Sequence, residues 1–288
     1  MRIRATVAAV SGALALSAFV APAAQADNAA PSYKAEASKV LGTSGRTTFG
    51  ATTAADDLGV TFSNFKIASA VKVGTTNDVS TTVTYTLTHG ADYVLNSDDY
   101  DNGPLIYKGS SDDPDNMLFG TKPATCTATS STTASCKGLV DIHPADGDLV
   151  NSDAGTWSGG AVAIQYSSDD SSVSFGLGTT KVQRYSKLTV NAGPEPVVKG
   201  RTITSTGKLS RANWEDNKYH GYTNQPVKLQ FRKAGTSTYT TIKTVTSDST
   251  GNLKATATAV SDGYWRFSFA GTTTTPAVSA TGDYVDVH

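Results

Sequence analysis

The chain has few of the residues that build helices, metal centres or redox sites. Its 288 residues include only two cysteines, two methionines and four histidines, and 17% of them are charged. Leucine and glutamate are also sparse, whereas threonine, serine, valine and tyrosine recur. This composition disfavours helix-rich packing and favours pleated sheets with one buried face. The sequence therefore predicts an all-β protein.

The chain also lacks the local motifs of the common enzyme classes. There is no G-x-S-x-G, no H-E-x-x-H and no glycine-rich nucleotide loop after a strand, and no histidine lies in a recognisable catalytic setting. Basic residues stand singly, which gives no support to nucleic-acid binding. We therefore predict a protein that is not an enzyme. A hydrolase whose carboxylate pair has no local motif is the alternative that stays open.

No segment beyond the N-terminus has the roughly 20 apolar residues that a membrane helix requires. At the N-terminus, Arg2 and Arg4 precede the apolar stretch ATVAAVSGALALSAFV, and Ala24-Gln25-Ala26 supplies a small-x-small cleavage site. These are the three parts of a secretory signal peptide. We predict that residues 1–26 are a signal peptide and that the mature protein is secreted, extracellular and without a membrane span.

The rest of the chain divides by pattern and by charge. Residues 27–57 have no sustained period, which predicts a flexible tail or spacer. Residues 27–185 carry eighteen acidic and ten basic side chains, whereas residues 186–288 carry seven acidic and twelve basic ones. The reversal favours an acidic domain over 58–185 and a C-terminal domain over 186–288. Drift in loop composition would give the same reversal.

Strand signals recur throughout both predicted domains. In VSTTVTYTL, which begins at Val79, apolar and hydroxyl side chains alternate as in a half-buried strand. Seven further strand segments fall within the last hundred or so residues. Short strands separated by Asp, Asn, Gly and Ser loops predict sandwiches rather than βαβ units.

The two cysteines, Cys126 and Cys136, are separated by TATSSTTAS. An exported protein with one such pair is expected to form a disulfide, and the spacing suits a hairpin staple. A redox site would need a CxxC pair, and a zinc site would need more ligands.

The C-terminal domain carries a set of recurring segments. They are KLQFR from Lys228, SDSTG from Ser247, the pair Trp265-Arg266 and the closing YVDV from Tyr284. In these segments the chain resembles the Ig-like domains of secreted proteins from high-GC Gram-positive bacteria, and GVTFSNFKI and STTVTYTLT in the acidic domain are more loosely similar. The resemblance implies two Ig-like β-sandwich domains in tandem. It also implies core positions for Leu229, Phe231, Trp265 and Phe267 and a positive φ at Gly251.

Proteins of this kind are often described as calcium-binding, and calcium requires six to eight clustered oxygens. Three loops are rich in carboxylates, and none of them fits the EF-hand template. The candidate ligands are Asp98, Asp99, Asp101, Asp112, Asp113, Asp115, Asp146, Asp148 and Asp153. They form either a calcium site of another kind or solvated turns in which Asp is the preferred residue.

The segment WEDNKYHGY gathers aromatic side chains beside two acids. As exposed groups, Trp214, Tyr219, His220 and Tyr222 would form a platform on which a sugar or a partner stacks. The alternative is that they pack over one end of the sandwich.

We therefore predict a secreted, non-catalytic protein with a structural, adhesive or ligand-binding role. Its partner would be an extracellular ligand, a cell-wall component or another protein. Calcium is the one cofactor that the sequence suggests.

Overall fold

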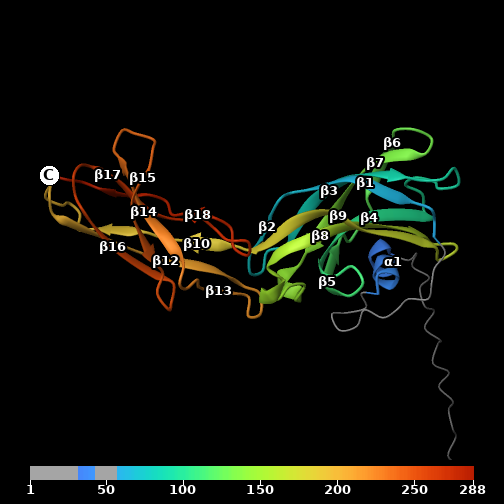
Figure 1. The fold of residues 1–288 in the computed structure, drawn as a ribbon, viewed down its shortest axis with the longest axis horizontal. Coiled ribbons are helices and arrows are strands. Elements are labelled where there is room, and N and C mark those ends of the chain that lie inside the picture. Colours follow the sequence, from blue (N-terminus) through green and yellow to red (C-terminus); the bar gives the residue numbers. More distant parts are fainter. Residues whose placement is uncertain (1–31, 43–56) are drawn as a thin grey trace, which may run out of the picture. The chain divides into compact units, whose positions relative to one another are not determined.

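The computed structural model describes residues 32–42 and 57–288, which belong to one compact unit (Figure 1). The predicted signal peptide and most of the predicted tail lie outside the described residues. Within the described ranges no helix is long and apolar enough to cross a membrane. Strands dominate and surround two large hydrophobic cores, which confirms the predicted all-β fold.

The first sandwich contains nine strands of the described chain. They are Thr61–Ile67 (β1), Val71–Val73 (β2), Val79–Thr88 (β3), Tyr100–Gly109 (β4), Pro114–Phe119 (β5), Thr125–Ala128 (β6), Thr133–Ile142 (β7), Gly155–Gln165 (β8) and Ser171–Arg184 (β9). One sheet has the order β1-β3-β7-β6 and the other has the order β2-β9-β8-β4-β5. Neighbouring strands are antiparallel, except that β2 runs parallel to β9.

This strand order is that of an immunoglobulin-like domain. Strands β1, β3, β7 and β6 take the places of A, B, E and D, and β9, β8, β4 and β5 take those of G, F, C and C′. The additional strand β5 beside β4 is a feature of the variable type rather than the constant type. The Ig-like prediction is therefore confirmed by the pairing of the strands.

A tryptophan occupies the corner where antibody domains carry a tyrosine. Trp157 lies at the start of β8, and its Nε1 donates to the carbonyl oxygen of Asp153 at 2.7 Å. Two residues later, Gly159 stands where those domains have their second cysteine. A Cβ at Gly159 would lie 2.5 Å from the ring of Phe65. An aromatic ring from β1 thus packs where the inter-sheet disulfide would be.

The disulfide of this protein lies elsewhere in the sandwich. Cys126 in β6 and Cys136 in β7 are directly paired across the two strands and are bonded, with their Cα atoms 4.1 Å apart. The predicted bridge is confirmed. It joins an edge strand to its neighbour within one sheet.

Strand β3 has the predicted alternation. Val83, Tyr85 and Leu87 are buried in the first core, whereas Ser80 and Thr82 are exposed on the outer face. The strand pairs with β1 on one side and with β7 on the other. It therefore presents a row of hydroxyls to solvent from the middle of a sheet.

The predicted flexible tail is wrong for one segment, because residues 33–40 form a helix, α1 (Tyr33–Val40). Ser32 caps it by accepting a hydrogen bond from the backbone nitrogen of Ala35 at 3.3 Å. Tyr33, Ala37 and Leu41 are four residues apart, lie on one helix face and pack against side chains of β4, β5 and β8. The tyrosine fits because Gly103 has no side chain: a Cβ there would lie 2.0 Å from the Tyr33 hydroxyl oxygen.

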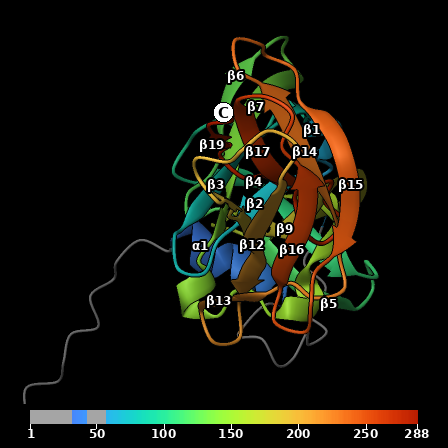
Figure 2. The same cartoon turned by 90° about the vertical axis from the view of Figure 1, so that its left-hand side faces the viewer.

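The second sandwich is built around a long strand. Its strands are Ser186–Leu188 (β10), Asn191–Gly193 (β11), Thr202–Asn213 (β12), Lys218–Gly221 (β13), Pro226–Lys233 (β14), Thr240–Thr246 (β15), Asn252–Thr258 (β16), Gly263–Phe269 (β17), Val278–Ser279 (β18) and Asp283–Val285 (β19). Strand β12 pairs with β10, β11, β13 and β16, while β14 lies between β15 and β17 in the facing sheet (Figure 2). Strands β18 and β19 pair with β17.

The core roles implied by the resemblance are confirmed for Leu229, Trp265 and Phe267, which are all buried. Gly251 has a φ of 83° and lies so close to the Leu209 carbonyl that no side chain would fit. Phe231 differs from the prediction, because it is only partly buried. The boundary between separate domains at residue 186 stays a prediction, since the described residues belong to one unit.

Candidate functional site

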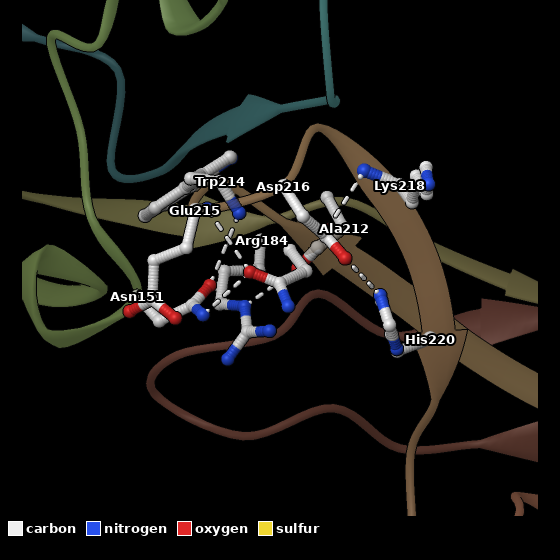
Figure 3. Close-up of polar contacts among 9 residues, drawn as sticks. Asn151, Arg184, Ala212, Trp214, Glu215, Asp216, Lys218 and His220 are labelled. Carbon is white, nitrogen blue, oxygen red and sulfur yellow. Dashed lines mark hydrogen bonds and ion pairs between the residues drawn. The ribbon is translucent and has the colours of Figure 1, made fainter.

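The predicted aromatic platform begins in the turn between β12 and β13 (Figure 3). The side chain of Trp214 is only 3% exposed and belongs to the first core. Its Nε1 donates to the carbonyl oxygen of Gly74 at 2.9 Å, and its backbone nitrogen donates to Oδ1 of Asn151 at 3.1 Å. The platform prediction is therefore wrong for Trp214, because burial leaves no open indole face for stacking.

The other members of the predicted platform are held by their own neighbours. The ammonium of Lys187 lies 3.6 Å from the ring centroid of Tyr219, and the guanidinium of Arg211 lies 3.9 Å from that of Tyr222. These cation–π contacts occupy one face of each ring. His220 is exposed, with its Nε2 2.6 Å from Oδ2 of Asp216. A role for these three residues in ligand binding stays a prediction.

The end of β12, just before this turn, is fixed by a buried arginine that the sequence did not single out. Nε of Arg184, in β9, donates to the carbonyl oxygen of Ala212 at 2.6 Å (Figure 3). Burial, followed by repulsion from Arg211, lowers the pKa of Arg184 to about 10. Arg184 and Trp214 together bind the β12–β13 turn to residues of the first sandwich.

The carboxylates of the Asp-rich loops accept hydrogen bonds from the protein itself. Oxygens of Asp99 accept from the side chain of Gln165 and from Ser167, and these bonds hold the pKa of Asp99 below its ordinary value. Oδ2 of Asp148 accepts from the His143 backbone nitrogen at 2.6 Å, and Oδ2 of Asp153 accepts from that of Val150 at 2.7 Å. Such contacts stabilise turns.

The structure does not bring the nine predicted calcium ligands together. Asp101 accepts from the Tyr166 hydroxyl at 2.6 Å, and burial raises the pKa of this carboxyl. In the ranges 32–42 and 57–288, no group of three or more His, Cys, Asp or Glu side chains could hold a metal ion. Calcium binding, including a role for Asp98, Asp112, Asp113, Asp115 and Asp146, stays a prediction.

Three histidines lie beside carboxylates. His143 is 3.2 Å from Asp78, and His288 is 3.5 Å from Asp286, in addition to the His220 pair. No hydroxyl or thiol of a described residue forms a hydrogen bond with any of these imidazoles. The described residues therefore show no hydrogen-bonded pair of nucleophile and base of the kind that covalent hydrolysis uses.

A groove of about 690 Å³ lies on the outer face of the sheet that contains β3 and β7. Its floor comes from outward-facing side chains that are paired across the two strands, Ser80 opposite Asp141 and Thr82 opposite Leu139. Lys137 and the segment 121–125 form the walls, and His143 with Asp78 forms one end. Four hydroxyl side chains, two lysines and two carboxylates line this surface.

Asp141 holds the wall of the groove in place. Its carboxylate accepts from the hydroxyl of Ser80 at 2.5 Å and from the backbone nitrogen and hydroxyl of Thr121 at 2.8 and 3.0 Å. Burial alone would raise the pKa of Asp141, but the hydrogen bonds from Ser80 and Thr121 outweigh it and lower the pKa. The carboxylate is therefore already hydrogen-bonded within the protein.

The two lysines and the two carboxylates of the groove carry balancing formal charges, but they differ in how they are held. Asp141 is engaged by three donors and Asp78 by His143. In contrast, Lys122 and Lys137 are exposed and form no ion pair with a described residue. The sequence signal for this surface is the row of hydroxyls on β3. Lys137 comes from β7, whose pairing with β3 is not visible in the sequence, and Lys122 comes from the segment before β6.

Comparison with known proteins does not assign a family. No family model and no curated protein matches the sequence. Among solved structures, a marsupial T cell receptor is 13% identical over 79% of this chain and 73% of its own, with a TM-score of 0.37. The Escherichia coli adhesin FdeC is 14% identical over 82% and 66%, with a TM-score of 0.32. Fibronectin(III)-like modules of Clostridium thermocellum CbhA are 13% identical over 77% and 92%, with a TM-score of 0.25.

Proposed function

We propose that the protein is a secreted, non-catalytic adhesive protein that binds an acidic, hydroxyl-rich glycan in the groove on β3 and β7. The groove carries this proposal. The hydroxyls of Thr82 and Thr125 can donate and accept hydrogen bonds with sugar hydroxyls, whereas those of Ser80 and Thr121 donate to Asp141 and can accept. Lys122 and Lys137 lie next to them and form no ion pair with a described residue. The N-terminal sequence pattern and the Cys126–Cys136 bridge support an extracellular setting, in which such polymers occur.

The attraction between the two lysines and an anionic sugar is local. Residues 27–185 carry eighteen acidic and ten basic side chains, so the sandwich as a whole repels anions at long range. At physiological ionic strength, charges more than about 8 Å apart are largely screened. Binding therefore depends on direct contact in the groove and weakens as salt is added.

An array of bacterial cell-wall glycans, probed with the mature protein, tests the proposal. We expect binding to glycans with carboxylate or phosphate groups, and a loss of about tenfold in affinity for the double variant Lys122→Ala/Lys137→Ala, the size expected for two exposed charge pairs. Lys66→Ala/Lys72→Ala removes two exposed lysines of the same sandwich outside the groove and serves as the matched control. Equal affinity of the two double variants would contradict the proposal that the glycan binds in the groove. Binding to no glycan on the array would contradict the adhesive function.

A further inference from the structure

Arginine and tyrosine side chains lie together on the outer face of the sheet formed by β14 and β17. Side chains alternate between the two faces of each strand, and the inward ones belong to the core of the second sandwich. Among the outward ones, Arg232 of β14 is directly opposite Tyr264 of β17, and Arg266 follows two residues later. The two arginines are therefore diagonal neighbours, with about 7–8 Å between their Cα atoms.

Aromatic rings hold both guanidinium groups in place. That of Arg232 lies 4.1 Å from the ring centroid of Tyr264 and 5.3 Å from that of Tyr239. The guanidinium of Arg266 lies 3.7 Å from the ring centroid of Tyr239, and the exposed ring of Tyr284 meets that of Tyr264 edge to face. We call these five residues the Arg–Tyr face. Because these contacts already order the side chains, little conformational entropy is left to lose when a partner binds.

Most hydrogen-bond donors of the two arginines remain available. Nη1 of Arg232 donates to the carbonyl oxygen of Thr236 at 2.5 Å, and Nε of Arg266 donates to Oε1 of Gln230 at 2.8 Å. Neither guanidinium forms an ion pair with a described residue. Each has five N–H donors in a planar fork that matches a carboxylate. The Arg–Tyr face therefore favours a partner with two carboxylates.

Two carboxylates of the same sandwich lie near Tyr284, at the margin of this face. Asp262 accepts a hydrogen bond from the backbone nitrogen of Val287 at 2.9 Å, and Asp286 lies 3.5 Å from the imidazole of His288. Neither carboxylate pairs with an arginine of the face, so the two guanidinium groups stay open to a partner.

The first sandwich carries carboxylates that are equally open. Asp112, Asp113 and Asp115 are exposed in the segment that joins β4 to β5, which we call the acidic loop, residues 112–115. In the part of the chain that the structure describes, nothing forms an ion pair with them or donates a hydrogen bond to their carboxylates. In the other two Asp-rich loops, by contrast, carboxylates such as those of Asp99 and Asp148 already accept hydrogen bonds.

The spacing of two of these carboxylates matches that of the arginines. Pro114 favours an extended backbone at Asp113, the residue before it. Asp115 has no partner in β4, because it is the extra residue of a β-bulge, which redirects its side chain. Two residues of extended chain span about 7 Å. Asp113 and Asp115 can therefore reach both arginines of one Arg–Tyr face.

We propose that the protein associates with a second copy of itself, the Arg–Tyr face of one molecule binding Asp113 and Asp115 of the other. Each guanidinium binds one carboxylate through paired N–H donors. The opposite net charges of residues 27–185 and 186–288 favour this orientation. Each pair leaves one face and one acidic loop unused, so further copies can add. The contact uses no residue of the groove and does not depend on a glycan ligand.

Sedimentation velocity of the mature protein, from micromolar to nearly millimolar concentration, tests the proposal. At low salt we expect the mean sedimentation coefficient to rise with concentration. The rise should disappear at about 0.5 M salt, because exposed charge pairs are then screened. A protein that stays monomeric at every concentration in low salt would overturn the proposal.

Two charge-reversed variants identify the surfaces in contact. Arg232→Glu/Arg266→Glu and Asp113→Lys/Asp115→Lys should each associate more than about tenfold more weakly than the wild type, because like charges then meet. An equimolar mixture of the two should associate again, because the intact face of one variant meets the intact acidic loop of the other. This recovery also shows that both variants are folded.

The matched control is Lys208→Glu/Lys254→Glu, which reverses two exposed charges in β12 and β16 of the facing sheet. It should associate as the wild type does. A mixture that stays monomeric, or a control that loses association to the same degree as the arginine variant, would contradict the assigned contact, whatever the glycan array shows.

Discussion

At the scale of single residues, the carboxylate of Asp141 has a structural role, because its hydrogen bonds are made within the protein. Ser80 and Thr121 donate three hydrogen bonds to it, and together they connect β3, β7 and the segment that begins at residue 121. Because these donors favour the ionised form, the pKa of Asp141 is lower in the folded protein than its ordinary value of 3.8. The carboxylate therefore stabilises the folded state above that value.

This shift predicts how stability depends on pH. The contribution of the ionised Asp141 carboxylate to the free energy of unfolding is fully present above pH 3.8. It is lost as the pH falls through the lower pKa of the folded state. We expect Asp141→Asn to lower the free energy of unfolding by about 1–3 kcal/mol at pH 7, and by progressively less below pH 3.8. Urea unfolding at a series of pH values measures this. Asp78→Asn, at an exposed position, is the control, and a difference that grows on acidification would contradict the assignment.

At the scale of elements, the disulfide joins β6, an edge strand of four residues, to the long strand β7. Closing so short a loop is worth about 2–3 kcal/mol by the chain-entropy relation. We expect the variant Cys126→Ala/Cys136→Ala to fold and to lose that amount of stability in denaturant unfolding. An unchanged free energy of unfolding would mean that the backbone hydrogen bonds between β6 and β7 are enough to hold the edge of the sheet. Failure to fold would mean that the bridge organises the whole sandwich.

Helix α1 makes a second prediction at this scale. It covers Met117, which is buried in the cluster formed by α1 and the sheet, and the sequence has only one other methionine, at position 1. Ala37→Asp places a charge in that cluster and should release the helix, so that hydrogen peroxide oxidises Met117 several times faster, as followed by mass spectrometry. Ala35→Asp, on the exposed face of the helix, is the matched control. Equal oxidation rates would show that α1 does not shield the sheet.

The elements also show what could be predicted from the sequence. The alternation in β3 and the Trp265–Phe267 pair were readable because each is a local pattern with a period of two. Helix α1 was missed because its packing depends on only three buried side chains. The groove was missed because it depends on pairing between Ser80 and Asp141, which are 61 residues apart. The burial of Trp214 depends on Gly74, 140 residues away.

At the scale of the whole molecule, the two sandwiches share a side chain. Trp214 belongs to the chain of the second sandwich and packs in the core of the first. Its replacement by alanine should lower the free energy of unfolding by about 3–5 kcal/mol, as for other buried aromatic residues. We further expect calorimetry to show one transition for the wild type and two for Trp214→Ala. His220→Ala, in the same hairpin but exposed, is the control, and a single transition in both variants would contradict this coupling.

Whole-molecule calorimetry also tests the prediction that calcium binds the Asp-rich loops. If it binds, millimolar calcium should raise the melting temperature and EDTA should reverse the rise, because a ligand of the folded state stabilises it by mass action. Identical melting in calcium and in EDTA would end the calcium hypothesis.

The position of Trp214 has a consequence for how such a chain can evolve. Sandwich domains in secreted proteins are commonly treated as independent units that recombination can exchange between proteins. Here, a cut at residue 186 would remove the indole that fills the first core and the acceptor of the Arg184 hydrogen bond to Ala212. A replacement partner would have to bring its own aromatic residue on a turn of the same length. Without such a neighbour, the first sandwich would lack one of the buried side chains of its own core.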